Sequence, residues 1–96
     1  MMNTYYLDLT SCKEKQDLYK LFEALPAEVH PDNLDALYDM FTSITQETKL
    51  IINNYEGYQA CYPEYFNAFI ESIKICIAYL YLFEQEYILY KIYIDI

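Results

Sequence analysis

Closely spaced carboxylates are the residues of this 96-residue sequence best suited to chemistry. Between Lys20 and Lys49 lie 28 residues with no Lys or Arg and six acids, which carry -6 of the formal net charge of -9. A concentrated negative field attracts and steers an oppositely charged partner. The sequence therefore predicts that this stretch binds a basic protein. The six acids are Glu23, Glu28, Asp32, Asp35, Asp39 and Glu47.

Helical spacing places three of these carboxylates on one face of residues 32–44. At about 100° per residue, Asp32, Asp35 and Asp39 fall within about 60° of one another. Four apolar residues fall within about 80° of one another on nearly the opposite side and predict a buried stripe. Tyr38 lies at the boundary, where its ring can pack and its hydroxyl can reach a ligand. The apolar stripe consists of Leu34, Leu37, Phe41 and Ile44.

The spacing of Asp35 and Asp39 is unfavourable for an isolated helix. Like charges at i, i+4 destabilise a helix by roughly 0.2 to 0.5 kcal/mol. Asp32 and Asp35 can be explained as carboxylates that cap a helix N-terminus and meet its positive dipole end. Asp39, about two turns in, has no such explanation, which predicts a functional position. The alternative is an ordinary solvated face on an acidic protein.

Catalysis is not expected. The single histidine, His30, has no Ser or Cys nearby in the sequence to serve as a nucleophile. A carboxylate-pair enzyme would need one carboxyl shielded enough to hold a proton, whereas Asp35 and Asp39 are predicted on an open face. Three cysteines without a CxxC pair do not make a zinc site, so they are expected to be small buried residues of a reducing compartment. We expect no metal, cofactor or small-molecule substrate.

Composition excludes several other ligand classes. All six basic residues are Lys, and a phosphate-binding surface needs clustered Lys and Arg, so nucleic acid and anionic membranes are not expected partners. No signal peptide is visible, and the longest apolar run, residues 75–83, is far shorter than the roughly 20 residues of a membrane span. A hydrophobic content of 55% predicts a folded chain. We expect one cytoplasmic domain spanning residues 1–96.

The elements that would position the acidic face can be read from the apolar pattern. Strands are predicted over residues 5–9, 49–53 and 87–96, and helices over residues 13–25, over 32–44, and from Pro63 onward. Helices between successive strands favour a small α/β domain with a three-stranded parallel sheet and about three to four helices. Residues 75–83, apolar on both faces, could instead form a strand paired with residues 87–96.

The heptad of residues 33–39, Asn-Leu-Asp-Ala-Leu-Tyr-Asp, resembles the signature of the barstar family, small acidic intracellular inhibitors of secreted microbial ribonucleases. The resemblance covers roughly the first 55 residues well and the remainder by layout only. It implies a fold of three parallel strands with helices, and binding to a basic ribonuclease through the acidic helix. By the resemblance, Asp35 and Asp39 occupy the phosphate positions of the ribonuclease active site, and Asn33 and Tyr38 line the same surface.

The sequence also departs from the family. Val29, His30 and Pro31 stand where the family has aromatic residues and a glycine, so His30 either replaces an aromatic contact or is a plain loop residue. A further acid that the family places late in the last helix has only Glu84 and Glu86 as positional candidates. The partner-binding set predicted from the sequence is therefore Asp35, Asp39, Asn33, Tyr38, His30, Asp32 and Glu84.

Two other functions remain open at this point. The acidic helix could dock on a different basic protein, which would make the chain an adaptor or an immunity protein against another toxin. The Tyr- and Ile-rich C-terminal region could instead form an oligomer interface. Tyr is favoured at interfaces, although most of the 13 tyrosines are expected in the core and on the sheet.

Overall fold

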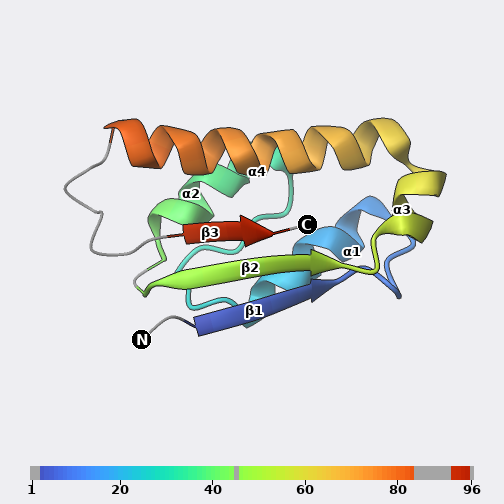
Figure 1. Ribbon diagram of the computed structural model, residues 1–96, viewed down its shortest axis with the longest axis horizontal. Coiled ribbons are helices and arrows are strands. Elements are labelled where there is room, and N and C mark those ends of the chain that lie inside the picture. The colour runs from blue at the N-terminus through green and yellow to red at the C-terminus, as the bar shows by residue number, and fades with distance from the viewer. Residues whose placement is uncertain (1–2, 45, 84–91, 96) are drawn as a thin grey trace.

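The computed structural model describes residues 3–44, 46–83 and 92–95 and has parallel strands and helices in one α/β arrangement (Figure 1). The predicted α/β class with parallel strand pairing is confirmed. In chain order the elements are β1 (Asn3–Asp8), α1 (Lys15–Lys20), the 3-10 helix η1 (Leu21–Ala24), the 3-10 helix η2 (Leu34–Ala36), α2 (Leu37–Thr42), β2 (Thr48–Asn53), α3 (Glu56–Cys61), α4 (Pro63–Phe83) and β3 (Ile92–Asp95).

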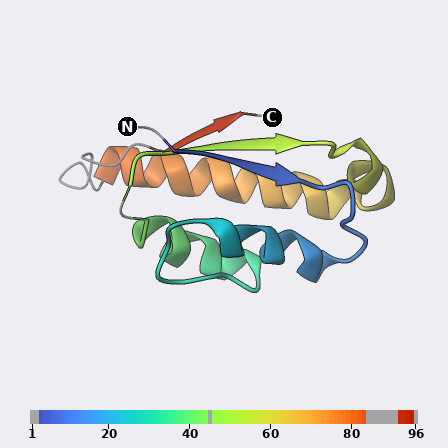
Figure 2. The ribbon, with the colours of Figure 1, turned by 90° about the horizontal axis from the view of Figure 1, so that it is seen from below.

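The strands lie in the order β1-β2-β3. β1 pairs in parallel with β2, from Asn3 opposite Thr48 to Asp8 opposite Asn53. β3 pairs in parallel with the other edge of β2, beginning with Thr48 opposite Ile92. Figure 2 shows α1, α2 and α4 on one side of this sheet, with α3 just beyond the end of β2. The chain therefore forms two layers, with the apolar core between them.

Alternation of side chains along β2 fixes which face of the sheet is covered. Thr48, Leu50 and Ile52 are buried, whereas the residues between them are only half-buried. On β1, Leu7 is buried while Tyr6 is 65% exposed. A slip of one residue would exchange the two faces, so burial on the helix side specifies the register.

Aromatic rings join the helices in the core. The ring of Phe22 from η1 lies 6.5 Å from that of Phe41 on α2 and 5.9 Å from that of Phe69 on α4. All three side chains are almost completely buried, as is Leu37. Full burial of such a side chain contributes roughly 1.5 to 3 kcal/mol, so α2 is held mainly by its apolar face.

Several expected boundaries differ from those in the structure. The helix expected over residues 13–25 divides into α1 and η1, and the one expected over 32–44 begins with η2 and ends at Thr42. α3 was not predicted, because it contains Gly57 and follows Asn54, which are residues typical of turns. Residues 75–83 belong to α4, so the alternative of a strand there is wrong. Of the strand expected over 87–96, residues 92–95 are strand and the others lie outside the described residues.

Cysteine burial also differs from expectation. Cys12 and Cys76 are half-buried, but Cys61 is exposed because it ends α3 at the surface. In the described ranges, no helix has both the length and the apolar character that crossing a lipid bilayer demands.

Tyr58 gives a prediction about stability in alkaline solution. Its side chain is 3% exposed, and its hydroxyl has no hydrogen-bond partner in the described part of the chain. Burial raises the pKa of Tyr58 from 10.0 to about 12. The folded state then holds the Tyr58 proton more tightly than the unfolded state does. The contribution of this proton to the free energy of unfolding is complete below pH 10 and is lost as pH rises toward 12.

Tyr58→Phe is therefore expected to keep or slightly raise the free energy of unfolding at pH 7, because no hydrogen bond is lost. The same change should reduce the decline in stability between pH 10 and pH 12. Urea denaturation at both ends of that range measures the effect. Tyr19→Phe is the control, since the Tyr19 hydroxyl is hydrogen-bonded to that of Tyr65 and its loss should destabilise at pH 7. A loss above about 1 kcal/mol for Tyr58→Phe at pH 7 would contradict the prediction.

Candidate protein-binding surface

The acidic segment, residues 32–43, begins with a capped turn. Asn33 is the N-cap of η2, with extended backbone, and its side-chain oxygen accepts a hydrogen bond from the Ala36 N–H at 2.9 Å. The Asn33 amide donates to Oδ1 of Asp32 at 2.9 Å. The expectation that Asp32 caps the helix is therefore wrong, since Asn33 has that role. Asp32 precedes the cap and stays exposed, with its carboxylate held by Asn33.

The two central carboxylates lie where the periodicity places them. Asp35 in η2 and Asp39 in α2 are both exposed, while Leu37 and Phe41 are buried. The predicted opposition of a carboxylate face and an apolar face is confirmed. Leu34 is half-buried rather than buried, because it stands in the first turn, at the edge of the core. We call the surface formed by Asp32, Asn33, Asp35 and Asp39 the acidic face.

Asp39 is less anomalous than its sequence position indicates. Since α2 starts at Leu37, Asp39 lies in the first turn of that helix, where negative charge is favourable. The expectation that Asp39 has no local compensation is therefore wrong. The stronger observation is the absence of counter-charge. In residues 3–44, 46–83 and 92–95, the one ion pair joins Lys20 to Asp17 at 3.8 Å, and no residue of the acidic face takes part in it.

Hydrogen bonds fix both ends of the acidic segment. Ser43, just after α2, accepts bonds from the N–H groups of Glu28 and Val29 at 3.1 and 3.2 Å through its hydroxyl. The Gln16 side-chain amide of the neighbouring helix donates to the Asp32 carbonyl at 3.3 Å. A surface held in this way loses little conformational freedom on binding. Sequence reasoning missed Ser43 and Gln16, because nothing in their spacing indicates these contacts.

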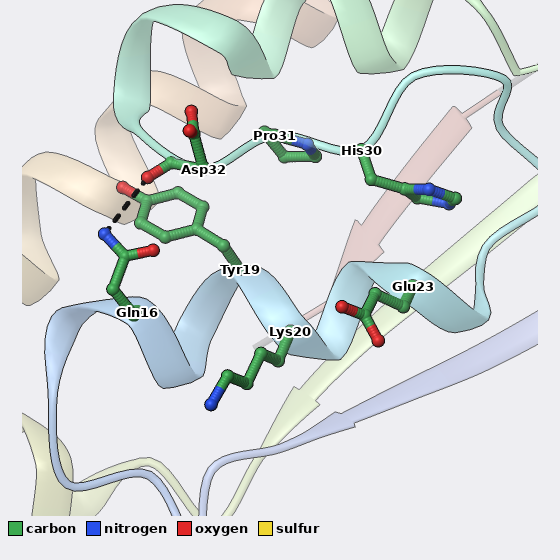
Figure 3. Close-up of a pocket in the computed structure, with 7 residues that line it drawn as sticks. All are labelled: Gln16, Tyr19, Lys20, Glu23, His30, Pro31 and Asp32. Atoms are coloured by element: carbon green, nitrogen blue, oxygen red, sulfur yellow. Dashed lines mark hydrogen bonds between the residues drawn. The ribbon is translucent and has the colours of Figure 1, made fainter.

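His30 lies on the loop before the acidic face. This loop borders a cleft of about 310 Å³ that is lined from the other side by α1 and η1 (Figure 3). Figure 3 shows the His30 ring directed away from Asp32, while Pro31 between them is buried. The structure therefore groups Asp32 and Asn33 but does not bring His30 into contact with them. His30 remains an exposed residue at the margin of the surface.

Tyr38 connects the acidic segment to α4. Its side chain is half-buried, as expected for a boundary position, and its ring meets that of Tyr79 edge to face, with 5.5 Å between centroids. Together with the exposed Ile75 and the half-buried Cys76, these rings line a groove of about 370 Å³. Sequence reasoning missed Ile75 and Tyr79 because residues 75–83 are apolar on both faces. Glu84, the remaining predicted contact, lies outside the described residues.

The chemistry available at this surface is that of carboxylates and phenols. In the described ranges, no three His, Cys, Asp or Glu side chains gather closely enough to hold a metal ion. What the geometry offers is a set of exposed carboxylates on a hydrogen-bonded segment, beside an apolar groove. The chain matches no model of a known protein family, and neither curated proteins nor solved structures give a match.

Proposed function

We propose that this chain is a barstar-like inhibitor of a secreted microbial ribonuclease. The observation that carries the proposal is the exposure of Asp35 and Asp39 on one side of a helical segment whose other side is buried. No Lys or Arg occurs between Lys20 and Lys49 to neutralise them. In this proposal the acidic face inserts into the cationic active site of the enzyme and excludes the RNA.

The arrangement of the elements supports the proposal. The acidic segment lies between β1 and β2, and the strands pair in parallel and are packed with helices, as the resemblance to the barstar family implies. We therefore propose a barstar-like fold, in which residues 1–96 form a single domain that acts without a cofactor and without catalysis of its own.

The chemistry of a ribonuclease site explains why carboxylates would bind there. Such a site is a concave patch of basic side chains that holds phosphates. A carboxylate presents two acceptor oxygens and makes charge-assisted hydrogen bonds to Arg and Lys, as a phosphate does. Asp35 and Asp39 are four residues apart on a held segment, so they can replace two substrate anions at little entropic cost.

Titration of the chain against a panel of secreted microbial ribonucleases tests the proposal. We expect the rate of RNA hydrolysis by at least one enzyme to fall to near zero at an equimolar ratio, in competition with substrate. The association rate should fall steeply as ionic strength rises to about 0.5 M, because screening shortens the reach of exposed charges. Failure to inhibit any basic ribonuclease would contradict the proposal.

One observation favours a second candidate, an adaptor that binds another basic protein. Next to Tyr38, the exposed face of α4 carries Ile75 and Tyr79 rather than an acid. A partner that contacts this part of the surface would need apolar groups as well as cations. Binding of a basic protein without inhibition of any ribonuclease in the panel would favour this candidate.

A further inference from the structure

The groove between α2 and α4 is apolar and open to solvent. It is lined by Tyr38, Ile75, Cys76 and Tyr79, with a volume of about 370 Å³. Ile75 is 64% exposed and Tyr79 48%. Burial raises the pKa of the Cys76 thiol, so this side chain is uncharged at neutral pH. Ile75 and Tyr79 are four residues apart on α4, about one helical turn, so their exposed apolar surfaces are neighbours.

The position of the groove relates it to the acidic face. Tyr38 is one of its walls, and the same residue lies between Asp35 and Asp39 in the sequence of the acidic segment. On α4 the exposed charges nearest in sequence to Ile75 are Glu71 and Lys74, which offset each other. On the other wall, Tyr38 lies next to Asp39 in the sequence and three residues after Asp35, both exposed acids, so a cation is favoured on that side of the groove.

We propose that this groove receives an aromatic or aliphatic side chain of the basic partner, from a segment in which Lys or Arg flanks that residue. The inference rests on the proposed function in one respect, that the acidic face binds a basic protein. Strong interfaces combine an apolar anchor in a pocket with charged contacts at the rim. Here the groove would supply the pocket and Asp35 and Asp39 the rim, so the groove would select among basic partners that the carboxylates alone accept equally.

Two capped pentapeptides are suitable probes. One has phenylalanine between two pairs of lysines, and the other has serine in that place, so they differ only in the apolar side chain. In NMR titrations at low salt we expect the phenylalanine peptide to bind the chain about fivefold more tightly, or better, because it alone buries apolar surface. The largest changes in chemical shift should be those of residues in α2 and in the middle of α4.

Three variants separate the contributions. Ile75→Gln should abolish the preference for phenylalanine, and because Ile75 is exposed the variant should fold normally. Tyr6→Thr is the matched control, since Tyr6 is equally exposed but lies on β1, and it should keep the preference. Asp39→Asn should weaken both peptides by the same factor. Thermal unfolding of each variant verifies the fold.

The outcomes distinguish this inference from the proposed function. Three results would contradict the proposed role of the groove: equal binding of the two peptides, no binding of either, or a preference for phenylalanine that survives Ile75→Gln. A preference that Ile75→Gln abolishes supports it, even if no ribonuclease in the panel is inhibited, in which case the partner belongs to another class of basic protein. Inhibition of a ribonuclease without any preference between the peptides would support the proposed function and contradict only the proposed role of the groove.

Discussion

Asp39→Asn is expected to weaken binding to the proposed ribonuclease partner by more than about 2 kcal/mol, or roughly thirtyfold, while leaving the thermal unfolding midpoint nearly unchanged. The side chain is exposed and makes no ion pair in the described ranges, so the fold loses little with its charge. Two small effects of opposite sign remain. Removing the charge relieves repulsion from Asp35 but gives up a favourable position in the first turn of α2.

Binding should respond differently from folding because the partner provides the cations. If the acidic face enters a cationic site, removing one carboxylate leaves desolvated cations on the enzyme without a counter-charge. The dissociation rate should therefore rise, and stopped-flow kinetics with calorimetry would measure it. Glu64→Gln is a matched control, since Glu64 is also an exposed acid in the first turn of a helix but lies at the start of α4.

Two results would contradict this expectation. Equal binding by Asp39→Asn and the parent chain would mean that Asp39 is not part of the binding surface. A large loss of stability with unchanged binding would make it a structural residue. If Glu64→Gln weakened binding as much as Asp39→Asn, the effect would be one of net charge rather than of the acidic face.

Leu37→Ala is expected to lower the free energy of unfolding by roughly 2 to 5 kcal/mol. Leu37 is fully buried at the first position of α2, on the side of the helix opposite Asp35 and Asp39. Truncation leaves a cavity among the core side chains that hold α2 against α4. Urea denaturation of the variant and the parent measures the difference.

Leu34→Ala, one turn earlier, is the matched comparison. Leu34 is half-buried, so its loss should cost clearly less than that of Leu37. The reverse order would mean that the segment faces the core differently from the structure. A cost below about 1 kcal/mol for Leu37→Ala would contradict its burial.

Sequence periodicity predicted the parts of the structure that depend on one dominant signal. Leu37, Phe41 and Ile44 are buried where helical spacing places them, because burial of an apolar stripe fixes the rotation of a helix. Asp35 and Asp39 are exposed for the same reason. Parallel pairing of β1 with β2 followed from the helices expected between them.

The remaining features depend on local geometry or on distant contacts. α3 contains Gly57 and follows Asn54, whose backbone has φ 53, and these turn-forming residues concealed a short helix. Because the 3-10 helix η2 precedes α2, α2 begins later in the sequence than predicted, and Asp39 lies in its first turn rather than in its interior. The groove could not be predicted, because the contact of Tyr38 with Tyr79 joins residues that no sequence pattern relates.

The offset between β1 and β2 has a consequence for how the chain acquires its structure during synthesis. Each residue of β1 pairs with one 45 positions later, as Asn3 with Thr48. At typical translation rates β1 must wait roughly 2 to 9 seconds for its partner strand. The acidic segment is made within that interval, before the sheet beneath it can close, and α4 follows later still. A nascent chain thus displays the negative charge early but gains a rigid recognition surface only after most of its length has been made.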